Sequence, residues 1–585
     1  MDTFNDLDTS QKVLYVVGGA AVVIVTVVGL RKLCFKKTKA KKDYPRDTVI
    51  HHQIGRGPYA PSMTPFAVKL ETYLRMAKIP YQNDHGMEPS SKGKLTWIEY
   101  NGHEVADSSL CIKFLNKKMS VDLNRSLSPA DRGIAQAMQA MAEDHIYWLI
   151  GLFRWQYDND KSFVMNALKL SKFTFWKFQR VLEKEAWSQG LGRHTEDEVA
   201  EMFKKDLQSL SDFIGMKKFL MGDEPCETDC AVFGQLSQVY WHFIGTGHDN
   251  ILKDKYPTLA AYCERMKEAF WPDWDQCITH GGKREATKYS QETTERVMDT
   301  FNDLNTSHKV LYVVGGAAVA IVTVVGLRKL CFKETKTKKD YPRDTVIHHQ
   351  TGRGPYVPSL TPYSVKLETY LRMAKISYQN VHGFQPSSKG KYTWIEYNGQ
   401  AVADSTLCIN FLNKKMGVDL NRNLSPAEKG VAQAMQTMVE DHLYWLIAIF
   451  RWQFDNDKSF IVNALKLSKF MLWTYRRLMT NQAWNQGLGR HTEDEATEMF
   501  KKDLQSLSDF IGTKKFLMGD EPCETDSAVF GQLSQIYWHF IGTGHDNILK
   551  DKYPNLAAYC ERMKETFWPD WDQCITHGGT REAAK

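Results

Sequence analysis

The chain has 585 residues, of which 43% are hydrophobic, and its formal net charge at pH 7 is +6. This length suggests about four domains. The charge is small for the length and no basic stripe carries interleaved aromatic residues, which argues against a nucleic-acid-binding protein. The 11 cysteines form no C-x-x-C pair and no closely spaced framework, a pattern typical of free thiols in a reducing compartment.

The sequence is a tandem duplication. The opening Met-Asp-Thr-Phe-Asn-Asp-Leu at Met1 recurs at Met298, and the same register then holds without a gap. This period is far too long for a solenoid repeat, so we interpret it as two complete copies of one protein. The polar stretch between the two copies predicts a flexible linker. We assign this linker to residues 279–309, up to the second apolar segment.

Each copy starts with an apolar segment that carries no charge, at 13–30 and at 310–327. A helix of this length spans about 27 Å, near the short end for a bilayer. We therefore predict a transmembrane helix at each position, with a buried or interfacial helix as the alternative. A cleaved signal peptide fits poorly, because the first residues are acidic and the basic cluster follows the segment.

The basic stretch from Arg31 to Lys42 places the globular part of the first copy in the cytosol by the positive-inside rule. By the same rule, the basic stretch from Arg328 to Lys339 places the residues after the second segment in the cytosol. The residues before that segment are already there, yet one span cannot begin and end on the same side. Three alternatives stay open. The second segment does not cross, it dips and returns, or the two copies are separate polypeptides in the organism.

The globular part begins with a βαβ pattern. A β-rich run at 47–53 precedes a Gly-Pro loop, and Thr64-Pro65 then starts a helix whose apolar residues recur at helical spacing. A second strand starts at Tyr81, an Asn-Gly hairpin covers 97–105, and Asp107-Ser108 caps a further helix. The order β-α-β-loop-β-β-α is typical of an α/β thioredoxin-like domain, predicted at 47–120 and again at 344–417.

The remainder of each copy is helical. Ser128-Pro129-Ala130-Asp131 is a helix start signal, and a long helix is expected to run from it through His145 and Trp155. Further helices are predicted at about 160–184, 195–214, 228–243 and 256–270. Together they form an all-α domain at 128–278, with its counterpart at 425–575.

A thioredoxin-like domain followed by an all-helical domain resembles the glutathione transferase fold. The residues that carry the resemblance include P-S-M-T-P-F-A-V-K-L-E-T-Y-L-R-M-A-K-I-P-Y from Pro61, G-K-L-T-W-I-E-Y-N-G from Gly93 and K-K-F-L-M-G-D-E-P-C-E-T-D-C-A-V-F-G-Q-L from Lys217. Through them each copy is similar to the failed axon connections family, which is related to the metaxins. The resemblance implies a membrane-associated, cytosol-facing protein of the endoplasmic reticulum or mitochondrial outer membrane, linked in animals to axon development. It does not by itself imply catalysis.

In transferases of this fold, a hydroxyl or thiol near the first helix holds the sulfur of glutathione. The resemblance implies this catalytic role for Thr64, and for Thr361 in the second copy, with Ser62 and Ser359 as a nearby second choice. A helix N-terminus can hold a thiolate or a carboxylate. Threonine cannot act as a redox thiol. The alternative is that Thr64 and Thr361 only cap the helix and bind no ligand.

The pairs Asp107-Ser108 and Asp404-Ser405 match the acid–serine pair that binds the γ-glutamyl end of glutathione in this family. The resemblance implies that the aspartate takes the ammonium group and the serine takes the carboxylate. A plain helix N-cap is the alternative, and the two roles are compatible.

Thr96 and Thr393 depart from the family pattern, which has a cis-proline at this position. A cis bond before a residue other than proline costs roughly 3 kcal/mol, so a trans bond is expected, and with it weaker binding of the thiol peptide. The sequence therefore favours a non-catalytic or weakly catalytic module that acts through protein contacts. An active glutathione transferase or peroxidase on apolar electrophiles and a metaxin-like role in mitochondrial import stay as alternatives.

The runs Glu143-Asp144-His145 and Glu440-Asp441-His442 place ionisable groups on different helix faces, which predicts a buried polar network and no metal site. Asp229 and Asp526 match a structural aspartate that caps a core helix of the fold. Glutathione is the one cofactor that the sequence suggests. Proteins of this fold commonly pair about a two-fold axis, so we expect the two linked copies to pair with each other, or the chain to form a homodimer.

Overall fold

The computed structural model describes residues 44–158, 161–279, 341–454, 459–465 and 468–577. The predicted apolar segments 13–30 and 310–327, and the predicted linker beyond Thr279, lie outside these ranges. Among the residues that are described, none of the helices is both long and apolar enough to cross a membrane. From Val49 onward the described residues of both copies belong to one compact unit.

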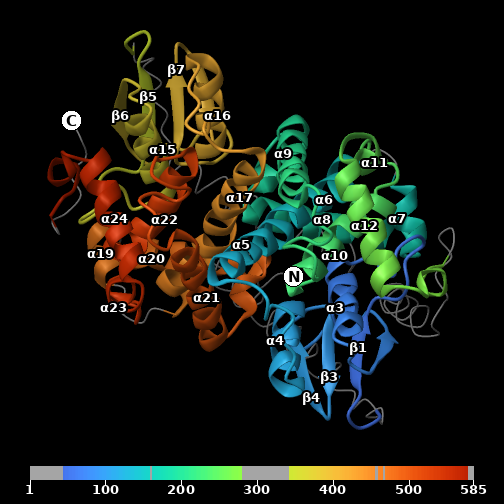
Figure 1. Ribbon diagram of the computed structural model, residues 1–585. Coiled ribbons are helices and arrows are strands. Elements are labelled where there is room, and N and C mark those ends of the chain that lie inside the picture. Colours follow the sequence, from blue (N-terminus) through green and yellow to red (C-terminus); the bar gives the residue numbers. More distant parts are fainter. Residues whose placement is uncertain (1–43, 159–160, 280–340, 455–458, 466–467, 578–585) are drawn as a thin grey trace, which may run out of the picture. The chain divides into compact units, whose positions relative to one another are not determined.

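Each copy contains a four-stranded mixed sheet (Figure 1). The strands of the first copy are β1 (Val49–Gln53), β2 (Tyr81–His85), β3 (Trp97–Tyr100) and β4 (His103–Ala106). They lie in the order β2-β1-β3-β4, with β2 parallel to β1 and the other two pairings antiparallel. Asn101 and Gly102 both have positive φ, as a type I′ hairpin turn requires. The second copy repeats this sheet with β5 (Val346–Gln350), β6 (Tyr378–His382), β7 (Trp394–Tyr397) and β8 (Gln400–Ala403).

Two helices pack on the sheet of the first copy, α3 (Pro65–Met76) and α4 (Ser108–Met119). Their fully buried residues Leu70 and Leu115 share a core with Val49 of β1 and Ile98 of β3. Burying one such side chain stabilises the fold by about 1.5–3 kcal/mol. The counterparts in the second copy are α15 (Pro362–Met373) and α16 (Ser405–Met416). The predicted thioredoxin-like order of elements is confirmed in both copies.

The helical domain of the first copy follows. It consists of α5 (Pro129–Ala140), α6 (Tyr147–Leu152), α7 (Ser162–Ala167), α8 (Lys172–Gln189), α9 (Glu196–Ile214), α10 (Glu227–Trp241), α11 (Ile251–Lys255) and α12 (Pro257–Phe270). The second copy has α17 (Pro426–Thr437), α18 (Tyr444–Ile449), α19 (Ser459–Leu465), α20 (Lys469–Gln486), α21 (Glu493–Ile511), α22 (Glu524–His539), α23 (Ile548–Lys552) and α24 (Pro554–Phe567).

Two helix predictions need correction. The helix expected at about 160–184 is two helices, α7 and α8, because Lys169 adopts a positive φ and Ser171 then caps a new helix by accepting from the Thr174 amide. The long helix after Ser128 is not a regular α-helix, because π-helical turns interrupt it at Met141–Ile146 and at Phe153–Tyr157.

The sheet domain and the helical domain of the first copy meet where α3 crosses α10. Gly234 on α10 makes this approach possible, because a Cβ atom there would lie 2.6 Å from the carbonyl oxygen of Pro65. Asp229 near the start of α10 accepts hydrogen bonds of 2.8 Å from the amides of Leu220 and Cys226. The predicted capping role of Asp229 is confirmed.

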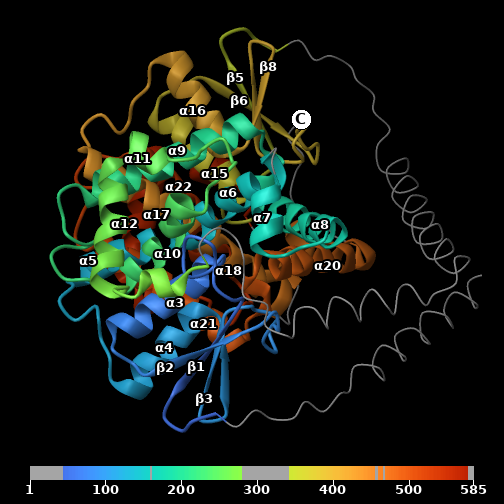
Figure 2. The ribbon, with the colours of Figure 1, turned by 90° about the vertical axis from the view of Figure 1, so that its right-hand side faces the viewer.

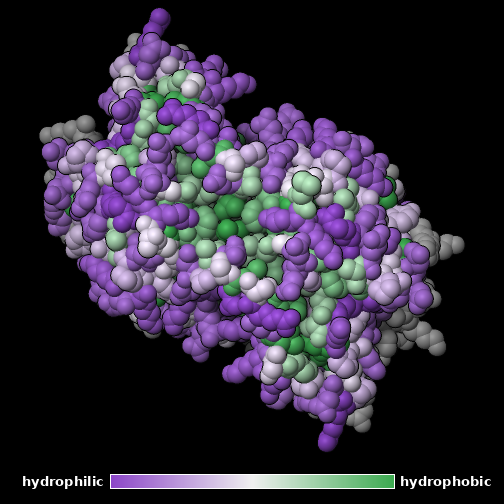
Figure 3. Space-filling model, viewed as in Figure 1, coloured by the Kyte–Doolittle hydropathy of each residue, from purple (hydrophilic) through white to green (hydrophobic). Residues whose placement is uncertain are grey.

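Helices of the two copies also contact each other. α5 packs against α21, α17 packs against α9, and α5 touches α17. Figure 3 shows apolar residues gathered around α5 and α17, within a surface that is otherwise mostly polar. A Cβ atom on Gly133 of α5 would lie 2.5 Å from the carbonyl oxygen of Ser506, and one on Gly430 of α17 would lie 2.5 Å from that of Ser209. The helices therefore approach closely at two glycines that the duplication places in equivalent positions.

A buried polar network lies at this contact. His145 Nδ1 is 2.5 Å from Asp206 Oδ2, and Gln433 of the other copy donates to Asp206 Oδ1 at 3.0 Å. The same arrangement recurs around Asp503, with His442 at 2.6 Å and Gln136 at 3.0 Å. The histidines of the two E-D-H runs thus belong to a polar network, as predicted.

The free energy of unfolding is expected to fall as the pH rises from 6.5 to 8. Burial opposes protonation of His145 and His442, but Asp206 and Asp503 raise the pKa of these histidines from 6.5 to about 9. A raised folded-state pKa gives its full stabilisation below the unfolded value of 6.5 and loses it as the pH approaches 9. Burial also raises the pKa of Asp144 and Asp441 to about 7, which acts in the same direction up to that pH.

Urea unfolding at pH 6.5 and at pH 8 measures the effect, and a decrease of about 2 kcal/mol or more is expected. The double variant Asp206→Asn, Asp503→Asn removes the charges that raise the histidine pKa values, so its stability should change less between the two pH values. Equal stability of the unaltered chain at both pH values would contradict the assignment.

Candidate functional site

A cavity of about 900 Å³ lies beside the N-terminus of α3 in the first copy. Thr64, Thr96, Asp107 and Ser108 contribute to its wall. The structure thus brings three of the four predicted site residues of this copy to one cavity. Ser62 is the exception, because it is buried away from the cavity wall and its hydroxyl accepts from the Thr64 amide at 3.3 Å.

The two copies differ at the threonine that starts the first helix. In the first copy the Thr64 hydroxyl makes no capping bond, and its contact with the Ser62 hydroxyl is 3.4 Å long. In the second copy Thr361 donates to Ser364 Oγ at 2.8 Å and accepts from the Ser364 amide at 3.3 Å. The position of Ser364 is Ala67 in the first copy. Only the Thr64 hydroxyl is therefore available to a ligand without breaking a side-chain bond of the cap.

Asp107 has a strained backbone. Its φ is 81° and its ψ is 128°, and Asp404 in the second copy has 83° and 128°. A residue with a side chain rarely adopts these angles, which cost of order 1–3 kcal/mol and persist mainly at functional sites. The strain occurs in both copies at the residue that the resemblance assigns to ligand binding.

Asp107 is held in its ionised form. Its carboxylate accepts from the Ser109 amide at 3.0 Å, and Lys94 Nζ lies 3.2 Å from Oδ2. Burial alone would raise the pKa of Asp107, but the charges of Lys94 and His491 hold that pKa well below its usual range. The site therefore holds an ionised carboxylate, paired with Lys94, at the N-terminus of α4.

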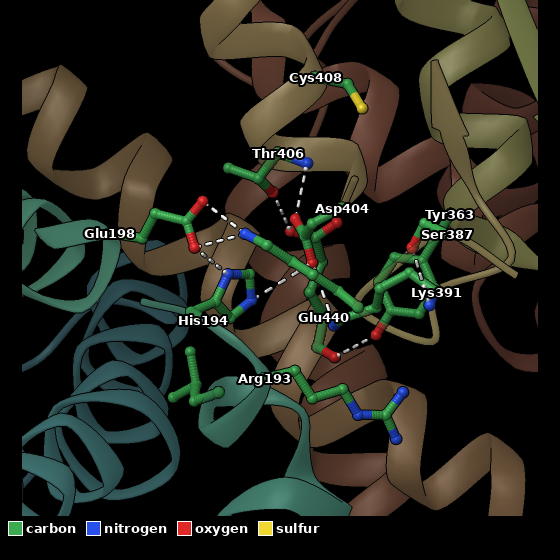
Figure 4. Close-up of polar contacts among 12 residues, drawn as sticks. Arg193, His194, Glu198, Tyr363, Ser387, Lys391, Asp404, Thr406, Cys408 and Glu440 are labelled. Atoms are coloured by element: carbon green, nitrogen blue, oxygen red, sulfur yellow. Dashed lines mark hydrogen bonds and ion pairs between the residues drawn. The ribbon is translucent and has the colours of Figure 1, made fainter. Parts of the chain in front are cut away.

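The second copy contributes residues to the site of the first, and the reverse also holds. His491 Nε2 lies 3.9 Å from Asp107 Oδ2, and Lys92 forms an ion pair of 2.5 Å with Glu495. Figure 4 shows the equivalent arrangement in the second copy, where His194 approaches Asp404 at 3.8 Å and Glu198 pairs with a lysine. Each aspartate is thus covered by the start of a helix from the other copy.

A buried lysine lies beneath each aspartate. Lys69 of α3 is 2% exposed, donates to Ser109 Oγ at 2.7 Å and forms an ion pair with Glu143. Lys366 binds Thr406 and Glu440 in the same way, at 2.7 Å each. This ion pair ties the sheet domain to the helical domain at the cavity wall. Sequence reasoning missed the pair, although a lysine on the apolar face of a predicted helix was a signal.

The peptide bond entering Thr96 is trans, as are all peptide bonds within the described ranges. No group of three potential metal ligands is found in the part of the chain that the structure describes. The nine cysteines described, such as Cys111 and Cys230, are buried free thiols, and burial raises the pKa of these two thiols. These thiols are poor nucleophiles because the reactive form is the thiolate.

Comparison with known proteins identifies the family. Residues 65–161 and 362–459 match the profile described as "Glutathione S-transferase N-terminal domain", and residues 203–266 and 500–563 match "Glutathione S-transferase, C-terminal domain". The chain is 31% identical over 228 residues to isoprene-epoxide–glutathione S-transferase of Rhodococcus sp. (strain AD45), covering 36% of this chain and 94% of that protein. The chain belongs to the glutathione S-transferase family.

Two further proteins are similar to this member of the glutathione S-transferase family. It is 34% identical over 260 residues to Failed axon connections of Drosophila melanogaster, covering 41% of this chain and 62% of that protein. It is 25% identical over 179 residues to a Metaxin-2 homolog of Caenorhabditis elegans, covering 28% of this chain and 76% of that protein. The resemblance to failed axon connections and the metaxins, and the duplication of a glutathione S-transferase unit, are confirmed.

Proposed function

We propose that the chain is a membrane-anchored glutathione-binding protein with weak or no transferase activity, which acts through protein contacts. The observation that carries glutathione binding is Asp107, a strained and permanently ionised residue at the cavity wall. Glycine would tolerate the positive φ at this position, but it would lose the carboxylate that caps α4 and pairs with Lys94. The same strain recurs at Asp404 in the second copy.

In this proposal the ammonium group of glutathione pairs with the Asp107 carboxylate, and its α-carboxylate binds at the N-terminus of α4 beside Ser108. The sulfur lies at the N-terminus of α3, where the Thr64 hydroxyl can donate to a thiolate. Conjugation would form a carbon–sulfur bond between that thiolate and an electrophile and would release the leaving group of the electrophile. A threonine hydroxyl stabilises the thiolate, and it supplies no redox chemistry.

Retention of the full chain on immobilised glutathione, with elution by free glutathione, tests the binding. Turnover of 1-chloro-2,4-dinitrobenzene with glutathione tests the chemistry. The proposal expects specific retention together with slow turnover. Absence of retention would contradict it, and rapid turnover would favour the alternative of an active transferase.

The first copy is expected to bind the thiol peptide more tightly than the second. Thr64→Val removes an available hydroxyl, so we expect the tighter affinity to fall about tenfold, the value of one hydrogen bond to a charged group. Thr361→Val is the matched control and should change that affinity little, since the Thr361 hydroxyl is bonded to Ser364. Glutathione titrations followed by tryptophan fluorescence would measure both, and equal losses would refute the difference between the copies.

Membrane association has two supports. The first is the pair of apolar segments, 13–30 and 310–327, in the sequence. The second is a face of α8 and α20, two helices that lie side by side in Figure 2 and in contact with each other. The two helices expose about half of each of the side chains Trp176, Trp187, Trp473 and Trp484. α20 carries basic but no acidic residues, whereas α8 carries basic residues together with Glu183 and Glu185. Exposed tryptophans flanked by basic side chains suit the interface of an anionic membrane.

Alkaline extraction of membranes from cells that express the full chain tests anchoring. The chain is expected in the membrane pellet, and its release into the supernatant would contradict a transmembrane anchor. The similarity to Failed axon connections and to a Metaxin-2 homolog supports a role in protein contacts. Cross-linking to mitochondrial import proteins would favour the metaxin-like alternative.

A further inference from the structure

The contacting helices α8 and α20 (Figure 2) each carry a regular stripe of exposed side chains that are mostly aromatic or basic. On α8 the stripe consists of Phe173, Trp176, Arg180, Lys184 and Trp187, which follow one another at intervals of three or four residues. This spacing places the five residues on one face of the helix. All five side chains are exposed, Trp176 by 50% and Trp187 by 52%.

The second copy repeats the stripe on α20. Its members are Phe470, Trp473, Arg477, Asn481 and Trp484, and all five are exposed. Most positions differ between the two helices, yet the phenylalanine, both tryptophans and the arginine of the stripe recur. We call the two stripes together the α8–α20 ridge.

The exposure of this ridge is unusual for a folded protein. The apolar face of a helix normally packs on the core, and most of the stability of a helix comes from that packing. Of the 18 residues of α20, all of which the structure describes, Ala483 is the one that is buried. More than half of the large hydrophobic residues that are exposed in the described part of the chain lie on α8 and α20. A large apolar surface of this kind marks an interaction site.

The ridge is basic as well as apolar. The guanidinium of Arg180 lies 5.9 Å from the ring centre of Trp176, and that of Arg477 lies 5.5 Å from the ring centre of Trp473. Basic residues outnumber acidic ones on both helices, and α20 has no acidic residue. Tryptophan is enriched at the membrane–water interface, and lysine and arginine attract anionic lipid headgroups. Helices that lie in this interface combine these residue types.

We propose that the α8–α20 ridge inserts its aromatic side chains into the interface of an anionic membrane and so docks the folded part of the chain on the lipid surface. The proposal rests on the proposed membrane association, and it names the docking surface and the class of lipid. A helix of 18 residues is about 27 Å long, so the aromatic side chains of one stripe are spread along a flat surface of that length. Because attraction between basic side chains and anionic headgroups is screened by salt, docking weakens at high ionic strength.

A fluorescent probe on the ridge of the full chain tests the proposal. Asn481→Cys is labelled with the dye nitrobenzoxadiazole in a chain that also carries Cys34→Ser and Cys331→Ser, because the other nine cysteines are buried. The labelled chain is reconstituted in vesicles of phosphatidylcholine and phosphatidylserine. We expect lipids with a nitroxide on the acyl chain to quench the probe, and iodide in the water to leave it bright. The same probe at Met216→Cys, a fully exposed position outside the ridge, should show the reverse.

Two outcomes would overturn the proposal. If iodide quenches the probe at Asn481→Cys, the ridge is not docked. If neither iodide nor the nitroxide lipids quench it, protein covers the ridge, either a second chain or an apolar segment of the same chain.

Charge reversal tests the choice of an anionic lipid. Arg180→Glu together with Arg477→Glu should abolish quenching by the nitroxide lipids, and so should vesicles of phosphatidylcholine alone. Arg125→Glu together with Arg422→Glu changes two equivalent exposed arginines outside the ridge, and this matched control should keep the quenching. Quenching that persists in the first pair, or that is equal in both kinds of vesicle, would contradict the role of charge.

Alkaline extraction of the same vesicles separates this proposal from the proposed membrane anchor. A chain that stays in the membrane pellet while iodide reaches the probe at Asn481→Cys keeps the anchor and loses the docked ridge. A chain that is released at alkaline pH, but whose probe the nitroxide lipids quench at neutral pH, docks through the ridge without a transmembrane anchor.

Discussion

Asp107→Asn is expected to weaken glutathione binding by the first copy about 100-fold, the effect of removing a charge-assisted pair in a partly buried site. Asparagine keeps the cap of α4 and tolerates positive φ, so the helix should stay intact. The affinity for glutathione can be measured by equilibrium dialysis with the labelled peptide. A loss of less than about threefold would show that the Asp107 carboxylate does not bind the ammonium group.

Two companion variants separate binding from folding. Asp107→Gly removes the carboxylate and also relieves the strain at φ 81°, so we expect lost binding together with little change in the free energy of unfolding, because relief of the strain is offset by loss of the cap and of the ion pair with Lys94. Asp404→Asn makes the same change in the second copy and should leave the tighter site nearly unchanged. Loss of stability in Asp107→Gly would instead favour a purely structural role for this aspartate.

Gly133→Ala is expected to separate the two copies. The new Cβ would lie 2.5 Å from the carbonyl oxygen of Ser506 and 3.3 Å from Phe510 Cβ, and backbone on the facing helix cannot move aside cheaply. Forcing a methyl group into such a contact costs about 1–3 kcal/mol, and Gly430→Ala adds the equivalent clash with Ser209. We expect the double variant to unfold at a lower temperature in calorimetry and to give a larger radius of gyration in X-ray scattering.

The chain provides a matched control for this substitution. A Cβ at Gly151 of α6 would meet no atom within 4 Å, and the second copy has alanine at the equivalent position, Ala448. Gly151→Ala should therefore stabilise the chain by about 0.4–1 kcal/mol. If the scattering of the unaltered chain showed two lobes without contact, or if Gly133→Ala behaved like Gly151→Ala, pairing of the copies would be wrong.

The order of the elements could be predicted because its signals are local. Thr64-Pro65, the Asn101-Gly102 turn and the Asp107 cap each specify a helix start or a hairpin within a few residues. The break between α7 and α8 could not be predicted in this way, because the apolar spacing continues across Lys169 while its backbone turns to positive φ. The π-helical turns also have no sequence signal, since they depend on tertiary packing.

The candidate site was only partly predictable. Asp107, Ser108 and Thr64 follow from motifs next to helix starts, and the structure places them at one cavity. His491 lies nearly 400 residues away from Asp107, in the other copy. Only the packing of the two copies brings it next to this aspartate, so the sequence gives no local signal for the contact. The Ala67 and Ser364 difference is visible in the sequence, but its effect on Thr361 requires the hydrogen-bond geometry of the cap.

Calorimetric titration of the full chain with reduced glutathione at neutral pH tests the central claim most directly. The proposed function predicts saturable binding with a tight site of about one glutathione per chain, lost in Asp107→Asn and kept in Asp404→Asn. Absence of binding heat at millimolar glutathione, or a titration that Asp107→Asn leaves unchanged, would contradict it.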